Sequence, residues 1–257
     1  MSAIILIPAR YASSRYPGKP LVVLKGADGE KTLIQRTWET GMAVPGVDLV
    51  LVATDDDRIA DAVRGFGGEV VMTSEDCANG TERCADAIAR MGVSPEIVVN
   101  LQGDAPLTPP WFLEDLIAGL RARPDLGVAT PVLRCDADTY RHFREDRAAG
   151  RVGGTTAVFA RDRRALYFSK EVIPFLPEAA QDAPPVYHHV GVYAYRPAAL
   201  ARYVEWSDGP LERNEGLEQL RFLENGEDVL CVEVESRGRV FWELNNPVDV
   251  ARIESLI

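Results

Sequence analysis

The sequence predicts an α/β fold of the doubly wound type, in which helices cover both faces of a mostly parallel sheet. Short apolar runs alternate with longer amphipathic stretches through the first half of the 257 residues. Several of these runs are apolar along most of their length, as strands buried on both faces are. Hydrophobic residues make up 46% of the chain and charged residues 26%, which is the balance of a globular protein with a sizeable core.

In the first half, β-branched runs predict strands, and apolar residues repeated every three or four positions predict helices. We expect strands at residues 3–7, 47–54, 69–72, 96–101 and 126–132, and helices at 31–42, 56–66, 80–91 and 110–121. A helix therefore stands between each strand and the next, which is the connection that parallel strands require.

From about Arg134 the pattern changes to short strands and loops. We expect a strand at 188–195, helices at 197–204 and 211–224, strands at 229–234 and 240–242, and a last helix after Asn246-Pro247. No linker composition or internal repeat divides the chain, so residues 1–257 are expected to form a single domain. The second half should extend the sheet and add a small strand-rich lobe, over about 134–225, at its carboxyl edge.

Charge and hydropathy exclude several classes of function. The chain carries 28 Lys and Arg against 39 Asp and Glu, a net charge of −11 at pH 7, so we expect no nucleic-acid partner. Its longest apolar stretches, 3–8 and 47–53, are far shorter than the roughly 20 residues that span a bilayer. The first charge, Arg10, follows the apolar run, which is the reverse of a secretory signal, so a cytoplasmic location is expected.

The cysteines show no spacing typical of a metal site or of a disulfide framework. We expect ordinary reduced thiols in a reducing compartment at Cys77, Cys84, Cys135 and Cys231.

A cationic loop follows the first predicted strand. Residues 9–20 place Arg10, Arg15 and Lys19 at the edge where open α/β sheets bind their ligands. Fixed donors with positive charge are what a polyphosphate requires, so these three are candidate catalytic residues. A solvated basic loop is the alternative.

Small residues in this loop, Ala9, Ser13 and Gly18, allow backbone N–H groups to face a nucleotide phosphate. The loop is not a P-loop, because Ser13 occupies the first glycine position of that motif and Pro20 occupies its Ser/Thr position. A dinucleotide glycine fingerprint is missing as well.

A second loop, residues 74–83, enters a predicted helix with Gly80-Thr81 at its start. Free N–H groups at a helix N-terminus suit an anion or the polar edge of a base. Simple helix capping by Asn79 or Thr81 is the alternative.

A third loop, Gln102-Gly103-Asp104, closes the most hydrophobic long strand. A carboxylate at this edge of the sheet can hold Mg²⁺ against substrate phosphates, so Asp104 is a candidate catalytic and metal-binding residue. A turn or N-cap aspartate is the alternative.

Taken together, these motifs resemble the CMP-sugar-acid synthetases, in particular the 3-deoxy-manno-octulosonate cytidylyltransferase (CMP-KDO synthetase) family. The matching stretches are Pro-Ala-Arg-x-x-Ser-x-Arg-x-Pro-Gly-Lys-Pro at 8–20, Asn-Gly-Thr-Glu-Arg at 79–83 and Val-Asn-x-Gln-Gly-Asp at 99–104. Later segments at 165–174, 189–195 and 211–221 fit too, so the likeness covers almost the whole chain in order.

The resemblance implies transfer of CMP from CTP to the anomeric hydroxyl of a 2-keto-3-deoxy sugar acid in lipopolysaccharide assembly, with Mg²⁺ and with release of pyrophosphate. It also implies a homodimer, with the lobe at 134–225 as sugar-binding and dimerisation region. It assigns nucleotide contacts to Gly80, Thr81, Arg83 and Gln102, and sugar-acid contacts to Gln102, His189, Tyr193, Glu218 and Gln219. For Tyr193 a core position is the alternative, and for Glu218 a helix-surface charge.

Departures from the family pattern concern the metal and the sugar. Asn245 stands where the family has a second metal-binding Asp, and it offers one neutral oxygen, so the metal should bind more weakly. Ala105 replaces a Glu, and Lys170 replaces an Arg whose fork can hold a carboxylate. A modified acid such as 8-amino-octulosonate, or a nucleotide-binding relative without catalysis, are the alternative functions.

Overall fold

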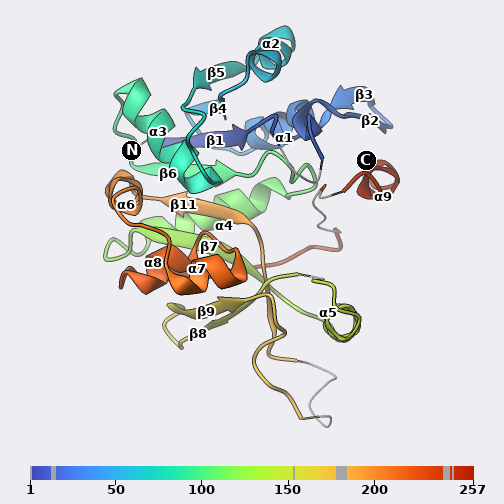
Figure 1. The fold of residues 1–257 in the computed structure, drawn as a ribbon, viewed down its shortest axis with the longest axis vertical. Helices are drawn as coiled ribbons and strands as arrows, with labels where there is room; N and C mark the ends of the chain where they lie inside the picture. The colour runs from blue at the N-terminus through green and yellow to red at the C-terminus, as the bar shows by residue number, and fades with distance from the viewer. Residues whose placement is uncertain (1, 13–15, 153, 178–183, 240–243, 245) are drawn as a thin grey trace.

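The computed structural model describes residues 2–12, 16–152, 154–177, 184–239, 244 and 246–257. Its parallel half contains the strands β5 (Glu69–Met72), β4 (Leu49–Thr54), β1 (Ala3–Ala9) and β6 (Ile97–Leu101), side by side in that order (Figure 1). The helices α1 (Leu33–Met42), α2 (Asp57–Gly65), α3 (Gly80–Met91) and α4 (Pro110–Arg121) follow successive strands. This order confirms the predicted α/β, doubly wound arrangement.

Strand β1 shows why helices cover both faces of the sheet. Its residues Ala3, Ile5 and Ile7 are buried in one core cluster with side chains of α1, α2 and α4. Ile4 and Leu6 point the other way, into a second cluster with α3 and with α6 (Pro197–Tyr203). A strand buried on both faces needs no polar residues, which is why this run is apolar throughout.

The second half extends the same sheet. Strand β11 (Val192–Tyr195) runs antiparallel between β6 and β7 (Val128–Arg134), so β6 and β7 point the same way and the sheet remains mostly parallel. Strand β12 (Val229–Val234) pairs with β7 in parallel. The strands β10 (Tyr187–His189), β8 (Thr156–Phe159) and β9 (Ala165–Ser169) continue it, antiparallel, to the end opposite β5 (Figure 1).

Two elements that were predicted to be continuous are each divided into two in the structure. The strand expected at 188–195 is interrupted after His189, because β10 pairs with β8 whereas β11 pairs with β6. The helix expected at 211–224 is two short helices, α7 (Pro210–Glu215) and α8 (Leu220–Glu224). Gly216 ends α7 in the left-handed region, at φ 61°, a conformation that other residues adopt only with strain.

Other elements are not foreseen by the sequence. A hairpin of β2 (Val23–Gly26) and β3 (Gly29–Thr32) precedes α1, so the helix expected at 31–42 begins at Leu33. Helix α5 (Ala137–Ala148) lies where only strands and loops are expected, and a 3-10 turn, η1 (Lys19–Leu21), follows the cationic loop.

The remaining predicted elements agree with the structure within two residues at each end, and the last helix is α9 (Asp249–Glu254). The strand expected at 240–242 lies outside the described residues. In the described part of the chain, every helix lacks the length or the apolar character needed to cross a membrane.

Candidate active site

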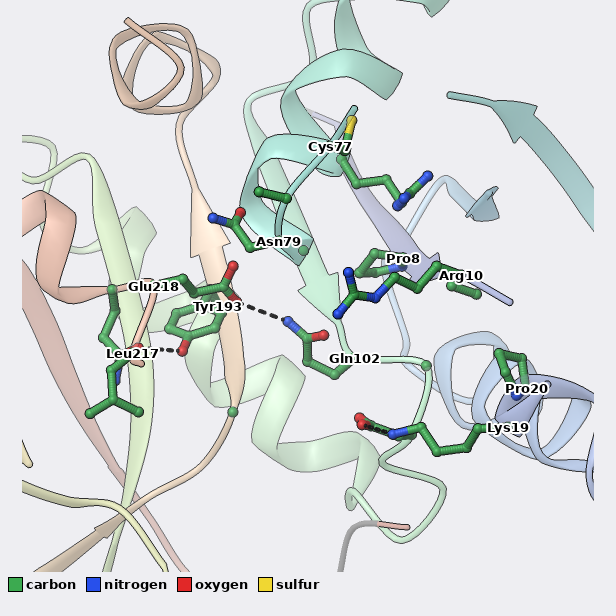
Figure 2. Close-up of a pocket in the computed structure, with 18 of the residues that line it drawn as sticks. Pro8, Arg10, Lys19, Pro20, Cys77, Asn79, Gln102, Tyr193, Leu217 and Glu218 are labelled. Carbon is green, nitrogen blue, oxygen red and sulfur yellow. Dashed lines mark hydrogen bonds and ion pairs between the residues drawn. The ribbon is translucent and has the colours of Figure 1, made fainter. Parts of the chain in front are cut away.

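A cavity of about 430 Å³ opens at the carboxyl ends of β1 and β6 (Figure 2). This is the edge at which open α/β sheets bind ligands. Six segments that are far apart in the sequence line it: residues 8–10, 19–20, 77–80 with Arg83, 102–104, Gly191 with Tyr193, and 216–219.

Lys19 and Asp104 form an ion pair on one wall of this cavity, with 2.6 Å between the Lys19 Nζ atom and an Asp104 carboxylate oxygen. Both side chains are partly exposed, at 15% and 26%. Arg10 comes directly after β1, is exposed, and points into the same space (Figure 2). The structure therefore brings three of the four predicted catalytic residues together, and the fourth, Arg15, lies outside the described residues, as Ser13 does.

Two features let the backbone come close to the cavity. Ala9, the last residue of β1, lines it while staying buried. A Cβ atom at Gly103 would lie 2.8 Å from the carbonyl oxygen of Pro8, a distance that real side chains do not reach. Gly103 therefore allows the Gln102–Asp104 loop to pack against the end of β1.

The Glu218 side chain, predicted to contact the sugar acid, is hydrogen-bonded to two residues predicted to contact the nucleotide, Thr81 and Gln102. One carboxylate oxygen accepts a hydrogen bond from the backbone N–H of Thr81, at 3.0 Å. The other accepts one from the Gln102 amide, at 3.1 Å, which Figure 2 shows as a dashed line. Burial raises the pKa of Glu218, although the Thr81 hydrogen bonds oppose the rise. The carboxyl is thus a bound component of the cavity wall, and the helix-surface alternative is wrong.

Gly80 and Thr81 begin α3 under this carboxyl. A Cβ atom at Gly80 would lie 2.7 Å from the Gln102 amide nitrogen, so only glycine lets that side chain approach. Thr81 does not line the cavity with its side chain; its hydroxyl shares a buried hydrogen bond of 2.7 Å with the Tyr195 hydroxyl. Its contribution is the backbone N–H at the helix N-terminus.

Tyr193 and Gln219 are buried and line the cavity together. The Tyr193 hydroxyl donates to the Gln219 side-chain oxygen, at 3.0 Å. This bond fixes the amide so that its nitrogen, Nε2, is buried with no hydrogen-bond partner among the described residues. A buried donor of this kind calls for an acceptor, which a ligand in the cavity can supply.

His189 lies behind Tyr193, not on the cavity wall. The two rings are 5.6 Å apart, and the His189 Nε2 atom shares a hydrogen bond of 2.9 Å with the Thr130 hydroxyl. Burial lowers the pKa of His189 to about 3, so the ring is neutral at physiological pH. The structure therefore places it as a support for Tyr193.

Arg83 is buried at the opposite side of the loop that enters α3, and it lines the cavity. Its guanidinium donates to the Thr73 hydroxyl, at 2.6 Å, and reaches the Asp55 carboxylate, at 3.4 Å. These contacts tie the start of α3 to the ends of β4 and β5.

Several residues that line the cavity were not predicted from the sequence. Asn79 is the N-cap of α3, since its side chain accepts from the Glu82 N–H at 2.8 Å, and it lines the cavity as well. Cys77, expected as an ordinary thiol, also lines it. Gly216 and Leu217 reach the cavity because the predicted helix breaks there, and Gly216 itself is the signal in the sequence for that break.

The donor set near Asp104 fits a magnesium ion that is held mainly by a bound substrate. Among the described residues, no group of three His, Cys, Asp or Glu side chains is placed to hold a metal. Mg²⁺ needs only one or two protein carboxylates when phosphates and waters complete its octahedron. Leu244 donates its N–H to the Asp104 carbonyl at 2.9 Å, while the predicted ligand Asn245 lies outside the described residues.

Comparisons with known proteins show the family to which the chain belongs. The family model described as "Cytidylyltransferase" matches residues 4–229. A 3-deoxy-manno-octulosonate cytidylyltransferase from Maricaulis maris is 48% identical over all of this chain and 97% of its own length. An 8-amino-3,8-dideoxy-manno-octulosonate cytidylyltransferase from Shewanella sediminis is 43% identical over 88% of this chain and 87% of its own.

The fold has a solved counterpart as well. A CMP:2-keto-3-deoxy-manno-octonic acid synthetase, solved in complex with CTP, superposes with a TM-score of 0.85 and is 35% identical, covering 100% of this chain and 98% of its own. Sequence identity over the whole length and a shared fold together are stronger evidence of family membership than any single motif. The chain is a nucleotidyltransferase that belongs to the 3-deoxy-manno-octulosonate cytidylyltransferase family.

Proposed function

We propose that this chain transfers CMP from CTP to the anomeric hydroxyl of a 3-deoxy-octulosonate-type sugar acid, with Mg²⁺, and releases pyrophosphate. The observation that carries the proposal is the cavity itself, which has cations and a carboxylate at one end and buried hydrogen-bonding groups at the other. The names of the relatives and of the CTP-bound neighbour support the same pair of substrates.

At the nucleotide end, Arg10 and Lys19 would neutralise the triphosphate, because both line the cavity with a cationic group. The N-terminus of α3 borders this end of the cavity, and the positive end of the helix dipole favours an anion or a polar base edge, although the Thr81 and Glu82 N–H groups already donate to Glu218 and Asn79. When bound, Mg²⁺ would supply further positive charge at the phosphates, and Asp104 would hold it, with Asn245 as second candidate ligand.

At the sugar end, Glu218 and the Gln102 amide can accept and donate hydrogen bonds to sugar hydroxyls, and the unpartnered Gln219 nitrogen can donate to a carboxylate or hydroxyl oxygen. Tyr193 holds that amide in place. These groups would orient the acid so that its anomeric oxygen faces the α-phosphorus.

The reaction then needs positioning more than covalent work by the protein. A bond forms between the anomeric oxygen and the α-phosphorus, the bond from that phosphorus to pyrophosphate breaks, and the proton of the hydroxyl passes to water. Arg10 and Lys19 would stabilise the negative charge that develops on the leaving phosphates.

The modified acid, 8-amino-octulosonate, is a second candidate acceptor. The relative named for that acid is 43% identical to this chain, and the sequence departs from the family pattern at Ala105 and Lys170. Neither Ala105 nor Lys170 lines the cavity, so both candidates share CTP as donor.

We also propose that the protein works in the cytoplasm for lipopolysaccharide assembly and pairs as a homodimer through the lobe at 134–225. Strand β9 stands at the end of the sheet and exposes Leu166 to 65%, an edge that a second copy would cover. Light scattering on the purified protein tests the dimer.

The test of the reaction is pyrophosphate release from CTP and Mg²⁺ with three separate acceptors: octulosonate, its 8-amino analogue and a nine-carbon sialic-type acid. We expect release only with an eight-carbon acid, and with CTP in preference to ATP, GTP and UTP. Equal release without any acid would contradict the proposal.

A further inference from the structure

The side chain of Arg221 joins three helices around the break between α7 and α8. Its Nε and one terminal nitrogen, Nη2, contact both carboxylate oxygens of Glu212 in α7, at 2.6 and 2.7 Å. Its other terminal nitrogen, Nη1, contacts Glu82 in α3, at 2.9 Å. The side chain is only 7% exposed, so these charges meet with little water between them.

The contact with Glu82 reaches the loop of residues 77–80, which we call the nucleotide loop. The second carboxylate oxygen of Glu82 accepts a hydrogen bond from the backbone N–H of Ala78, at 2.8 Å. The Arg221 guanidinium also lies 4.3 Å from the ring centre of Tyr203. Arg221 is thus tied to the wall of the cavity that the nucleotide end of the proposed site uses.

Tyr203 makes a second connection between the same two parts. Its hydroxyl accepts from the Asn79 amide at 3.0 Å and donates to the backbone carbonyl of Glu218 at 3.2 Å. Residues 216–219, which we call the sugar segment, therefore meet the nucleotide loop through Tyr203 and Arg221. The Thr81 N–H adds a direct bond to the Glu218 side chain.

The sugar segment needs such support because the helices beside it are short. Helix α7 has six residues and α8 has five, and helices of that length are unstable without tertiary contacts. Arg221 holds α7 through Glu212 while it belongs to α8 itself. It thereby fixes the distance between the two helix ends from which Glu218 and Gln219 enter the cavity.

We propose that Arg221 is a positioning residue that sets the sugar segment against the nucleotide loop, and so aligns the sugar acid with the α-phosphorus. This inference rests on the proposed function for its kinetic consequence. Arg221 does not line the cavity, so it would act through Glu218 and Gln219 without touching either substrate.

The chemistry of the contact explains why the residue is an arginine. A guanidinium presents donors in a rigid planar fork and can satisfy Glu212 with two of them while a third meets Glu82. A lysine has one nitrogen on a flexible stem and cannot hold both carboxylates in this geometry. Arg221→Lys should therefore restore activity only in part.

The test compares Arg221→Met with Arg221→Met/Glu212→Gln, Arg221→Lys and a matched control, Arg202→Met. Arg202 also contacts a glutamate with two nitrogens, Glu227 at 3.1 and 2.6 Å, but on the exposed face of α6 away from the cavity. The double variant removes the carboxylate that Arg221→Met leaves buried and unpaired, which should recover thermal stability.

Each variant is studied by steady-state kinetics and by hydrogen exchange. Steady-state kinetics should show that Arg221→Met raises KM for the sugar acid and lowers kcat, with a combined loss in kcat/KM of about 100-fold. CTP binding without the acid should weaken far less, because Arg10 and Lys19 line the cavity without contacting Arg221. The double variant should keep this loss even as its Tm recovers. Hydrogen exchange should be faster in residues 216–221 and 77–80 of both variants, but unchanged there in Arg202→Met.

The outcomes separate the two proposals. Wild-type protein that transfers no CMP would contradict the proposed function, whereas the exchange measurement would still decide the role of Arg221. Unchanged exchange in 216–221, or kinetics that recover together with Tm in the double variant, would overturn the positioning role and leave Arg221 as a purely stabilising residue.

Discussion

The Lys19 Nζ atom lies 2.6 Å from the Asp104 carboxylate. The cation proposed to hold the triphosphate and the carboxylate proposed to hold the metal are thus partners of each other in the free cavity. Neither charge is left alone, which lowers the cost of keeping both at a partly buried site. When CTP and Mg²⁺ bind, the triphosphate would replace Asp104 as the partner of Lys19, and Mg²⁺ would replace Lys19 as the partner of Asp104.

Replacing Lys19 with Ala should therefore impair both binding and turnover. Loss of one preorganised cation at the developing charge is expected to reduce kcat/KM for CTP by about 100-fold. Steady-state kinetics at saturating sugar acid measure it. Lys25→Ala is the control, because the Lys25 side chain is 73% exposed and its ion-pair partner also lies on the surface. Equal kinetics in the two variants would mean that Lys19 takes no part in binding CTP and that the cationic loop is a solvated surface loop.

Replacing Asp104 with Asn should lower turnover by about 100-fold or more, since the amide lacks the charge that holds Mg²⁺. The backbone hydrogen bond from Leu244 to residue 104 can persist, so the fold should survive, as circular dichroism can verify. Asp61→Asn, at a 76% exposed position, serves as the control. Wild-type rates in the Asp104 variant would rule out its metal role.

Replacing Asn245 with Asp should strengthen metal binding. A second carboxylate adds the charge that the family pattern has at this position, so the Mg²⁺ concentration for half-maximal rate should fall. The measurement is a titration of Mg²⁺ at fixed CTP in both proteins. An unchanged or higher Mg²⁺ requirement would mean that residue 245 takes no part in holding the metal.

The buried His189 and the half-buried His188 should make the fold sensitive to acid. Burial lowers the pKa of His189 to about 3 and that of His188 to about 4, against 6.5 for the ordinary group. Below pH 6.5 both histidines bind protons in the unfolded chain but remain neutral in the folded chain until the pH approaches their lowered pKa values. The free energy of unfolding should thus fall between pH 6.5 and these lower values, by up to about 1.4 kcal/mol per pH unit for each histidine.

Urea denaturation at several pH values between 7 and 4 tests this slope. His189→Gln should make the slope shallower, since its side chain takes up no proton, whereas His142→Gln, at an exposed position of α5, should leave the slope as it is. Parallel pH profiles for wild type and His189→Gln would contradict the buried neutral imidazole.

The nucleotide end of the site could be predicted from the sequence, because strand order alone places it. Arg10, Lys19 and Asp104 follow apolar strands that are adjacent and parallel, and the carboxyl ends of such strands meet at one edge. The resemblance was needed for Glu218 and Gln219. Helical periodicity continues through Gly216, so the glycine itself is the one sign in the sequence of the break that brings them to the cavity.

Elements with little apolar surface were missed for a physical reason. Helix α5 buries only Tyr140 and Phe143, too few to produce a helical period among its charged residues. The hairpin of β2 and β3 did carry a signal, Asp28-Gly29 at its turn, but its strands are mostly exposed and lack a clear alternation.

The most direct test of the central claim follows phosphorus chemistry in a single tube. The protein is mixed with CTP, Mg²⁺ and octulosonate or its 8-amino analogue, and phosphorus NMR records the products over time. The proposed function predicts one phosphodiester of CMP with the sugar for each pyrophosphate released, and neither without the acid. Pyrophosphate with free CMP in place of the phosphodiester, or no reaction with either acid at rates above those of Asp104→Asn, would contradict it.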